Sequence, residues 1–250
     1  MDGSRLKILC FKKVQIPLKI YSIQNIKYMK SSILALLLTF SGITAIFAQT
    51  NAAADKEAYN KMITDRAAKI VTKLYLNDAK KTEKVTVIVR DQYSNLNDIY
   101  AARDTRVKEI KEKNKDNKVE RDSALAKDGR IVERALNKLH KKYISKLSAQ
   151  LTNEQVELVK NGMTYNVLPI TYKAYQEEIL TLTEDQKKQI LIWLTEAREH
   201  AMDAESSDKK HAWFGKYKGR INNYLSAAGY DLKKEGVEWE KRRNAKARGN

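Results

Sequence analysis

Apolar residues recur every three or four positions through most of the chain beyond residue 54, a spacing that predicts α-helices. The pattern covers residues 55–74, 78–113 and 123–148. Strand-like alternation is nearly absent, and the one β-branched run, residues 85–89, also fits the helical period. The charged segment 112–122 predicts a solvent-exposed turn. Two long helices joined by a polar turn predict a protruding hairpin.

The motif Leu-Thr-x-x-Gln occurs twice, at residues 151–155 and 182–186. A threonine at the N-cap and a glutamine at the third helical position can form a capping box, in which each side chain bonds the other residue's backbone N–H. We therefore expect further helices to begin after Thr152 and Thr183. Capping chemistry accounts for the threonine and the glutamine of both motifs.

The stretch from Trp193 to Tyr230 predicts a helical hairpin, with a polar loop at residues 205–209 and a second helix over 209–228. Gly229 suits the left-handed residue that ends many helices. Aromatic and planar polar side chains are concentrated here, as a sugar site requires. The candidate ligand-binding residues in this stretch are Trp193, His200, His211, Trp213, Tyr217, Arg220, Asn222, Asn223 and Tyr224.

Two further observations bear on these candidates. A basic margin of Lys209, Lys210, Lys216 and Lys218 favours an acidic saccharide such as a uronic acid. The alternative is that the rings pack in the core and the basic residues are a solvated rim, because aromatic stripes at helical spacing are commonly core.

Residues 162–175 predict a non-helical apolar segment, because Pro169 ends a helix or shapes a turn. Tyr165 and Tyr172 are candidate ligand-binding residues in this segment, since phenol rings commonly line clefts. The alternative is a connector that packs on the core.

Together these patterns predict an all-α fold, a bundle of about six helices with a long N-terminal hairpin and a compact, aromatic-rich C-terminal half. We expect a single helical domain over residues 50–232, followed by a basic tail over 233–250.

The N-terminal residues 1–49 are interpreted as an extension plus a signal peptide. Lys30 precedes an apolar run over residues 33–48 and then small residues, the order found in secretory signals. Met29 is the better start, so the signal covers about residues 29–49 and predicts a periplasmic or secreted protein with no membrane span in its mature form. An uncleaved anchor helix is the alternative, although the run is short for a span. Cys10 lies before the cleavage zone, so the mature chain has no thiol.

The chain of 250 residues carries 48 Lys and Arg against 31 Asp and Glu, a formal charge of +17. Part of this excess belongs to the first 49 residues. A basic protein of this kind could bind nucleic acid, but export would separate it from most nucleic acid. We therefore predict no nucleic-acid partner.

A metal site and a catalytic site are two further possibilities for the same residues. Glu196, His200 and Asp203 share one helix face, and His211 could join them, but no recognised metalloenzyme motif is present, so no metal and no cofactor are predicted. An enzyme is the first alternative to a binding protein: His200, His211, Tyr217 and Arg220 offer the groups that a polysaccharide lyase or hydrolase needs. His140, on a lysine-rich face, is expected to be solvated.

The sequence NGMTYNVLPITYKAY, together with the run from Leu182 to Gly236, resembles an uncharacterised family of secreted helical proteins. That family is described as a sugar-binding domain of unknown function, found beside the polysaccharide-degrading systems of Gram-negative bacteria. The resemblance covers about residues 54–240 and implies an exported carbohydrate-binding or accessory protein of polysaccharide use. It assigns no catalytic residues.

The two Leu-Thr-x-x-Gln motifs also resemble those of periplasmic chaperones of the Spy type. This resemblance covers only two five-residue matches, and it gives a periplasmic chaperone as the second alternative. Carbohydrate binding without catalysis is the favoured prediction. The glycan and the oligomeric state are left open.

Overall fold

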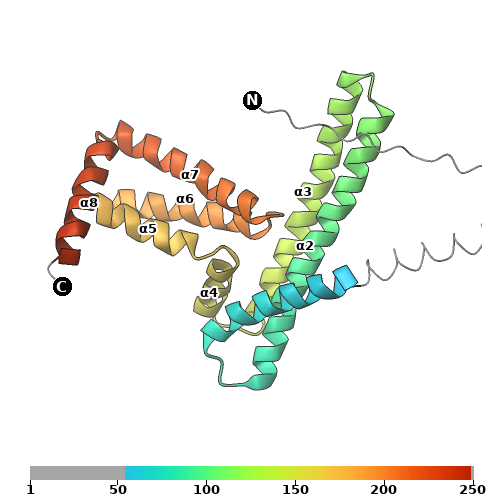
Figure 1. The fold of residues 1–250 in the computed structure, drawn as a ribbon, viewed down its shortest axis with the longest axis horizontal. Helices are drawn as coiled ribbons and strands as arrows, with labels where there is room; N and C mark the ends of the chain where they lie inside the picture. Colours follow the sequence, from blue (N-terminus) through green and yellow to red (C-terminus); the bar gives the residue numbers. More distant parts are fainter. Residues whose placement is uncertain (1–53, 249–250) are drawn as a thin grey trace, which may run out of the picture. The chain divides into compact units, whose positions relative to one another are not determined.

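The computed structural model describes residues 54–248, which contain eight α-helices and no strand (Figure 1). A helix over residues 54–71 continues into a 3₁₀ turn, η2, at Thr72–Leu74. The remaining helices are α2 (Ala79–Lys113), α3 (Lys118–Ser148), α4 (Asn153–Met163), α5 (Val167–Glu178), α6 (Glu184–Met202), α7 (Ser207–Ala227) and α8 (Leu232–Arg248). The predicted all-α class is confirmed. The predicted signal peptide, Met29 and Cys10 lie outside the described residues.

Two helices were not expected, which is why the structure has eight rather than about six. The segment 162–175 was predicted to be non-helical, but most of it belongs to α5. Pro169 is the third residue of that helix, where a missing N–H costs nothing because first-turn amides have no partner within the helix. The predicted basic tail is helix α8, which packs on α5 and α7.

Side-chain caps define where the helices begin. Thr152 and Thr183 both form the predicted capping boxes, each accepting the backbone N–H of the glutamine three residues on. Asp78 and Asn117 cap α2 and α3 in the same way, through the N–H groups of Lys81 and Glu120. The turn between α2 and α3 is only residues 114–117, shorter than the predicted 112–122.

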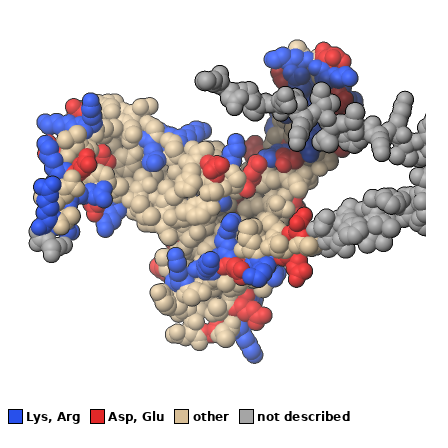
Figure 2. Space-filling view, viewed as in Figure 1, with Lys and Arg blue, Asp and Glu red and all other residues tan. Residues whose placement is uncertain are grey.

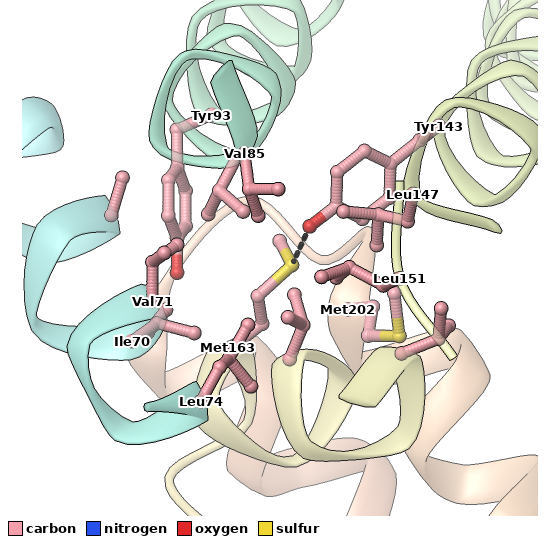
Figure 3. Packing of buried hydrophobic residues seen from close by; sticks show 14 of the residues in the cluster. Ile70, Val71, Leu74, Val85, Tyr93, Tyr143, Leu147, Leu151, Met163 and Met202 are labelled. Carbon is pink, nitrogen blue, oxygen red and sulfur yellow. Dashed lines mark hydrogen bonds between the residues drawn. The ribbon is translucent and has the colours of Figure 1, made fainter. Parts of the chain in front are cut away.

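The helices enclose two groups of buried apolar residues. The first lies between the helix 54–71, α2, the end of α3, and α4, where Tyr143 donates a hydrogen bond to the sulfur of Met163 at 3.0 Å (Figure 3). The second lies between α5, α6 and α7, around Leu194 and Phe214. Helix α6 contributes Met202 to the first group and Leu194 to the second, so it joins the two.

Within residues 54–248, no helix is both long enough and apolar enough to cross a membrane.

Gly162 of α4 lies directly against Ile70 of the helix 54–71. A Cβ atom at this position would lie 2.9 Å from Cγ2 of Ile70, which is a buried, branched side chain. We expect Gly162→Ala to destabilise the protein by about 1 kcal/mol or more, because overpacking outweighs the better helix propensity of alanine. Chemical denaturation measures the change.

Gly219→Ala is the matched control. Gly219 also lies inside an α-helix, α7, but a Cβ atom there would have no neighbour within 4 Å. It should stabilise the protein by roughly 0.5–1 kcal/mol. Equal stabilisation by both substitutions would contradict the close packing at Gly162.

Candidate functional site

The loop between α6 and α7, residues 203–206, is held by side chains from α2 and α3. Asp203, which ends α6, accepts a hydrogen bond from Gln92 Nε2 at 3.3 Å, and its Oδ2 lies 2.7 Å from Nδ1 of His140. The hydroxyl of Tyr100 donates to the backbone carbonyl of Asp203 at 2.7 Å. Arg103 reaches the carboxylate of Glu205 at 2.6 Å. These contacts fix the loop on the α2–α3 hairpin.

His140 is not simply solvated, as the sequence suggested. Its ring lies between two carboxylates, with Nδ1 on Asp203 and Nε2 3.4 Å from Glu199. Hydrogen bonds to Asp203 and then Glu199 outweigh the effect of burial and raise the pKa of His140 to about 9. The imidazole is therefore charged at neutral pH. Neither partner is close to His140 in sequence, so no local pattern could have revealed the pair.

Glu199 continues this network toward α4. It accepts from Arg198 at 2.9 Å and from Lys160 at 3.3 Å. Burial alone would raise the pKa of Glu199, but His140, Lys160 and Arg198 together lower it to about 2. Arg198 is only 2% exposed and also binds Glu157, at 2.6 Å. A buried guanidinium needs such partners, because an unpaired buried charge is strongly destabilising.

Lys210 was expected in a solvated basic margin, but it is buried and only 5% exposed. Its Nζ donates to the backbone carbonyls of Ala201 and Met202, at 2.8 and 2.9 Å. These carbonyls belong to the last turn of α6, where a cation is favoured by the helix dipole. Burial lowers the pKa of Lys210 to about 8, although the charge of Asp203 opposes the change.

A cavity of about 410 Å³ lies between the helix 54–71, α2 and the α6–α7 loop. We call it the tyrosine cavity, because four of its lining residues are Tyr59, Tyr93, Tyr100 and Tyr165. Its polar lining residues are Arg66, Asn97, Asp104, Glu205, Ser206, Ser207 and Lys210. The cavity thus combines flat apolar rings with planar and charged polar groups.

Tyr165 lies in the turn between α4 and α5 and is 43% exposed. Tyr165 and Asn166 both have left-handed backbone, with φ of 58° and 56°, a conformation that is costly for residues other than glycine. The ring of Tyr165 stacks on that of His211 from α7, with centroids 5.4 Å apart and planes 9° apart. Two predicted candidates, Tyr165 and His211, are therefore brought together, and Tyr165 lines the cavity.

A second cavity, of about 460 Å³, lies between α2, α3 and the α6–α7 hairpin. It shares Tyr100, Ala204 and Glu205 with the tyrosine cavity, so these residues form a common wall. His200 and Trp213 line it, with rings stacked 4.3 Å apart at 15°. These two predicted candidates are also brought together.

The remaining predicted candidates are placed along α5, α6 and α7. The ring centroids of Tyr217 and His200 are 6.2 Å apart. The guanidinium carbon of Arg220 lies 4.4 Å from the ring centroid of Trp193, and the rings of Trp193 and Tyr224 meet edge to face. A side chain of the same chain thus covers a face of Trp193, as His200 does for Trp213.

Three other predicted candidates, Asn222, Asn223 and Tyr172, lie away from both cavities. The Asn222 side chain accepts a hydrogen bond from the Tyr175 hydroxyl at 2.7 Å. Asn223 is exposed, and Tyr172 packs against the second group of buried residues. None of these three lines the tyrosine cavity or the second cavity.

Sequence reasoning missed most of the tyrosine cavity. Tyr59, Tyr93 and Tyr100 fall within the predicted helices 55–74 and 78–113, but neither they nor Arg66 and Asn97 were singled out as candidates. Helical periodicity shows which residues face inward, but it does not distinguish a packed core from the rim of a cavity. Asp203 and His200 share a helix face as predicted, but Asp203 binds His140. Among residues 54–248, no group of three or more potential ligands is arranged to hold a metal ion.

Comparison with known proteins identifies the family. A family model described as "Protein of unknown function (DUF3826)" matches residues 60–245. The match covers most of the chain, so the protein belongs to this family. No curated protein matches the chain.

The His140 network predicts a pH dependence of stability. A histidine whose pKa rises from 6.5 to about 9 on folding binds more protons in the folded state between these values. Its stabilising contribution is therefore complete below pH 6.5 and is lost as pH rises toward 9. Urea denaturation at pH 6.5 and pH 8 should show a loss of about 1–2 kcal/mol over this interval.

His140→Gln should remove this component, so that the variant loses less stability than the wild type over the same interval. His200→Gln is the control and should keep the wild-type loss. Lys210, with its pKa lowered to about 8, adds stability only as pH rises above 8, which is why the interval stops there. An unchanged pH dependence in His140→Gln would contradict the assignment.

Proposed function

We propose that the protein is an exported, non-catalytic carbohydrate-binding protein that holds a short stretch of an acidic polysaccharide in the tyrosine cavity. The observation that supports this most directly is the lining of that cavity, four tyrosines beside planar polar side chains. Its volume of about 410 Å³ falls in the range of roughly 300–1,000 Å³ typical of ligand sites.

The lining suits the chemistry of a sugar acid. The C–H faces of a pyranose ring pack on aromatic rings, and Tyr165 is the most exposed of the four lining tyrosines, although His211 stacks on its ring. The Asn97 amide and the Ser207 hydroxyl can each donate to and accept from sugar hydroxyls. A carboxylate on the sugar would be bound by the guanidinium of Arg66, which can form two parallel hydrogen bonds with it.

Charge in the cavity supports an acidic rather than a neutral ligand. The two carboxylates in the wall, Asp104 and Glu205, are both paired with Arg103, at 2.5 and 2.6 Å. Within residues 54–248, no carboxylate forms an ion pair with Arg66, whose guanidinium lies 5.4 Å from the ring centroid of Tyr93. Together with Arg103, the cavity has three cations, Arg66, Arg103 and Lys210, against the two carboxylates of Asp104 and Glu205. Arg66 has no carboxylate partner, so its charge is left for a ligand.

Other features support binding rather than catalysis. His140 and Lys210 have pKa values of about 9 and 8, but the first is bound by two carboxylates and the second by two backbone carbonyls. Both sets of contacts stabilise the fold. The Leu-Thr-x-x-Gln motifs form capping boxes, which accounts for them without a chaperone function. Export is supported by the basic and apolar pattern of residues 29–49.

Calorimetry of residues 50–250 with uronic-acid oligosaccharides and their neutral counterparts tests the proposal. Tyr165→Ala should weaken binding of the acidic oligosaccharide at least tenfold, which corresponds to about 1.4 kcal/mol. Tyr75→Ala is the matched control, because Tyr75 is also an exposed tyrosine with left-handed backbone but lies outside the cavity. Arg66→Gln should weaken binding of the acidic oligosaccharide only.

Trp213→Ala separates the two cavities, and it should leave binding unchanged. Loss of binding in Trp213→Ala with full binding in Tyr165→Ala would move the site to the second cavity. New reducing ends or unsaturated products in the same samples would identify an enzyme. An absence of binding to every glycan would refute carbohydrate binding.

A further inference from the structure

Helix α8 and the end of α5 form a strongly basic groove, separate from the two cavities. Lys and Arg side chains gather over α8, the helix at the left of Figures 1 and 2. Residues 241–248 of this helix include five basic residues and no acidic one. The groove has a volume of about 520 Å³, and its lining includes Leu180, Trp239, Arg242, Arg243 and Lys246.

The helix is firmly placed against α5. Arg242 donates from one nitrogen to the backbone carbonyls of both Glu177 and Glu178, each at 2.9 Å. These carbonyls lie at the C-terminal end of α5, where cations are favoured. Gly236 allows the Glu178 side chain to approach α8 closely, since a Cβ atom there would lie 3.3 Å from its carboxylate. The groove is thus a defined surface rather than a loose basic tail.

The groove combines apolar and cationic groups in one place. Leu180 is 66% exposed, and the Arg243 guanidinium lies 4.9 Å from the ring centroid of Trp239. The ion pairs within residues 54–248 do not involve Arg243 or Lys246, whereas Lys241 is paired with Glu238. The one carboxylate in the lining, Glu177, is paired with Lys173 at 3.6 Å. The surface therefore has positive charge available for a ligand.

From this arrangement we infer that the α5–α8 groove binds an acidic polysaccharide chain, with its carboxylates or sulfates on Arg243 and Lys246 and a sugar face on Trp239 and Leu180. The inference extends the proposed function, because the ligand class is the same, but none of these residues lines the tyrosine cavity. Two separate contacts with one polymer would raise the apparent affinity through multivalency.

A polysaccharide fits this surface better than a membrane does. A helix that lies in the membrane interface presents a broad apolar face to the lipid. The exposed apolar side chains of α8 are few: Val237 is 46% exposed, Trp239 is partly buried, and the first half carries Glu235, Glu238 and Glu240. An open groove edged by cations instead suits an extended chain with regularly spaced charges.

Binding of residues 50–250 to polygalacturonate at low salt tests the inference, with neutral dextran and phosphatidylglycerol vesicles measured beside it. The variant Arg243→Gln/Lys246→Gln should weaken polygalacturonate binding at least tenfold. The matched control Lys233→Gln/Lys234→Gln removes the same charge from the first turn of the same helix, outside the groove, and should weaken binding less than twofold. Dextran should not bind.

Three results would overturn the inference. Equal losses in the two double variants would show that net charge alone is responsible. Binding to the vesicles but not to polygalacturonate would assign the surface to lipid, and no binding to either would leave the groove without this ligand. A uronic-acid trisaccharide separates this inference from the cavity proposal: its binding should be lost in Tyr165→Ala and kept in the groove variant.

Discussion

The carboxylate and backbone of Asp203 are the contacts on which the candidate site depends. Asp203 ends α6, and it is held by Gln92 and Tyr100 from α2 and by His140 from α3. The loop that follows carries Ala204 and Glu205, which line both cavities. A shift of this loop would therefore change both cavities at once.

Buried charge explains why the end of α6 is so constrained. Arg198, Lys210 and His140 are cations with restricted access to water, and each has more than one oxygen partner. Removing one partner from such a group leaves an uncompensated charge and costs more than the pair contributes to stability. The network therefore favours a single geometry, and a preformed cavity loses less entropy when a ligand binds.

The sequence predicted the helices better than the site. Helical periodicity and the capping residues Thr152 and Thr183 reflect local physics, so the long helices, and the starts of α4 and α6, could be predicted. Helix α5 was missed because Pro169 was read as a break, although the first turn of a helix tolerates proline. The tyrosine cavity depends on contacts between residues roughly a hundred positions apart, such as Tyr100 and Asp203, and such contacts leave no signal in local spacing.

The turn at Tyr165, which also lines the tyrosine cavity, is connected to the network of buried charges at the end of α6. Its two left-handed residues each cost on the order of 1–3 kcal/mol and persist only where neighbours hold them. The Asn166 N–H donates to the carbonyl of Asn161 at 2.8 Å, and the side chain of Asn161 accepts from Arg198 at 2.9 Å.

Asn161 therefore links the turn to the Arg198 network. From Arg198 the contacts continue through Glu199 and His140 to Asp203 and the α6–α7 loop. Tyr75 is also left-handed and lies outside the cavity, so backbone strain alone does not indicate a site. What distinguishes Tyr165 is that one continuous set of polar contacts fixes both its turn and the loop that faces it across the cavity.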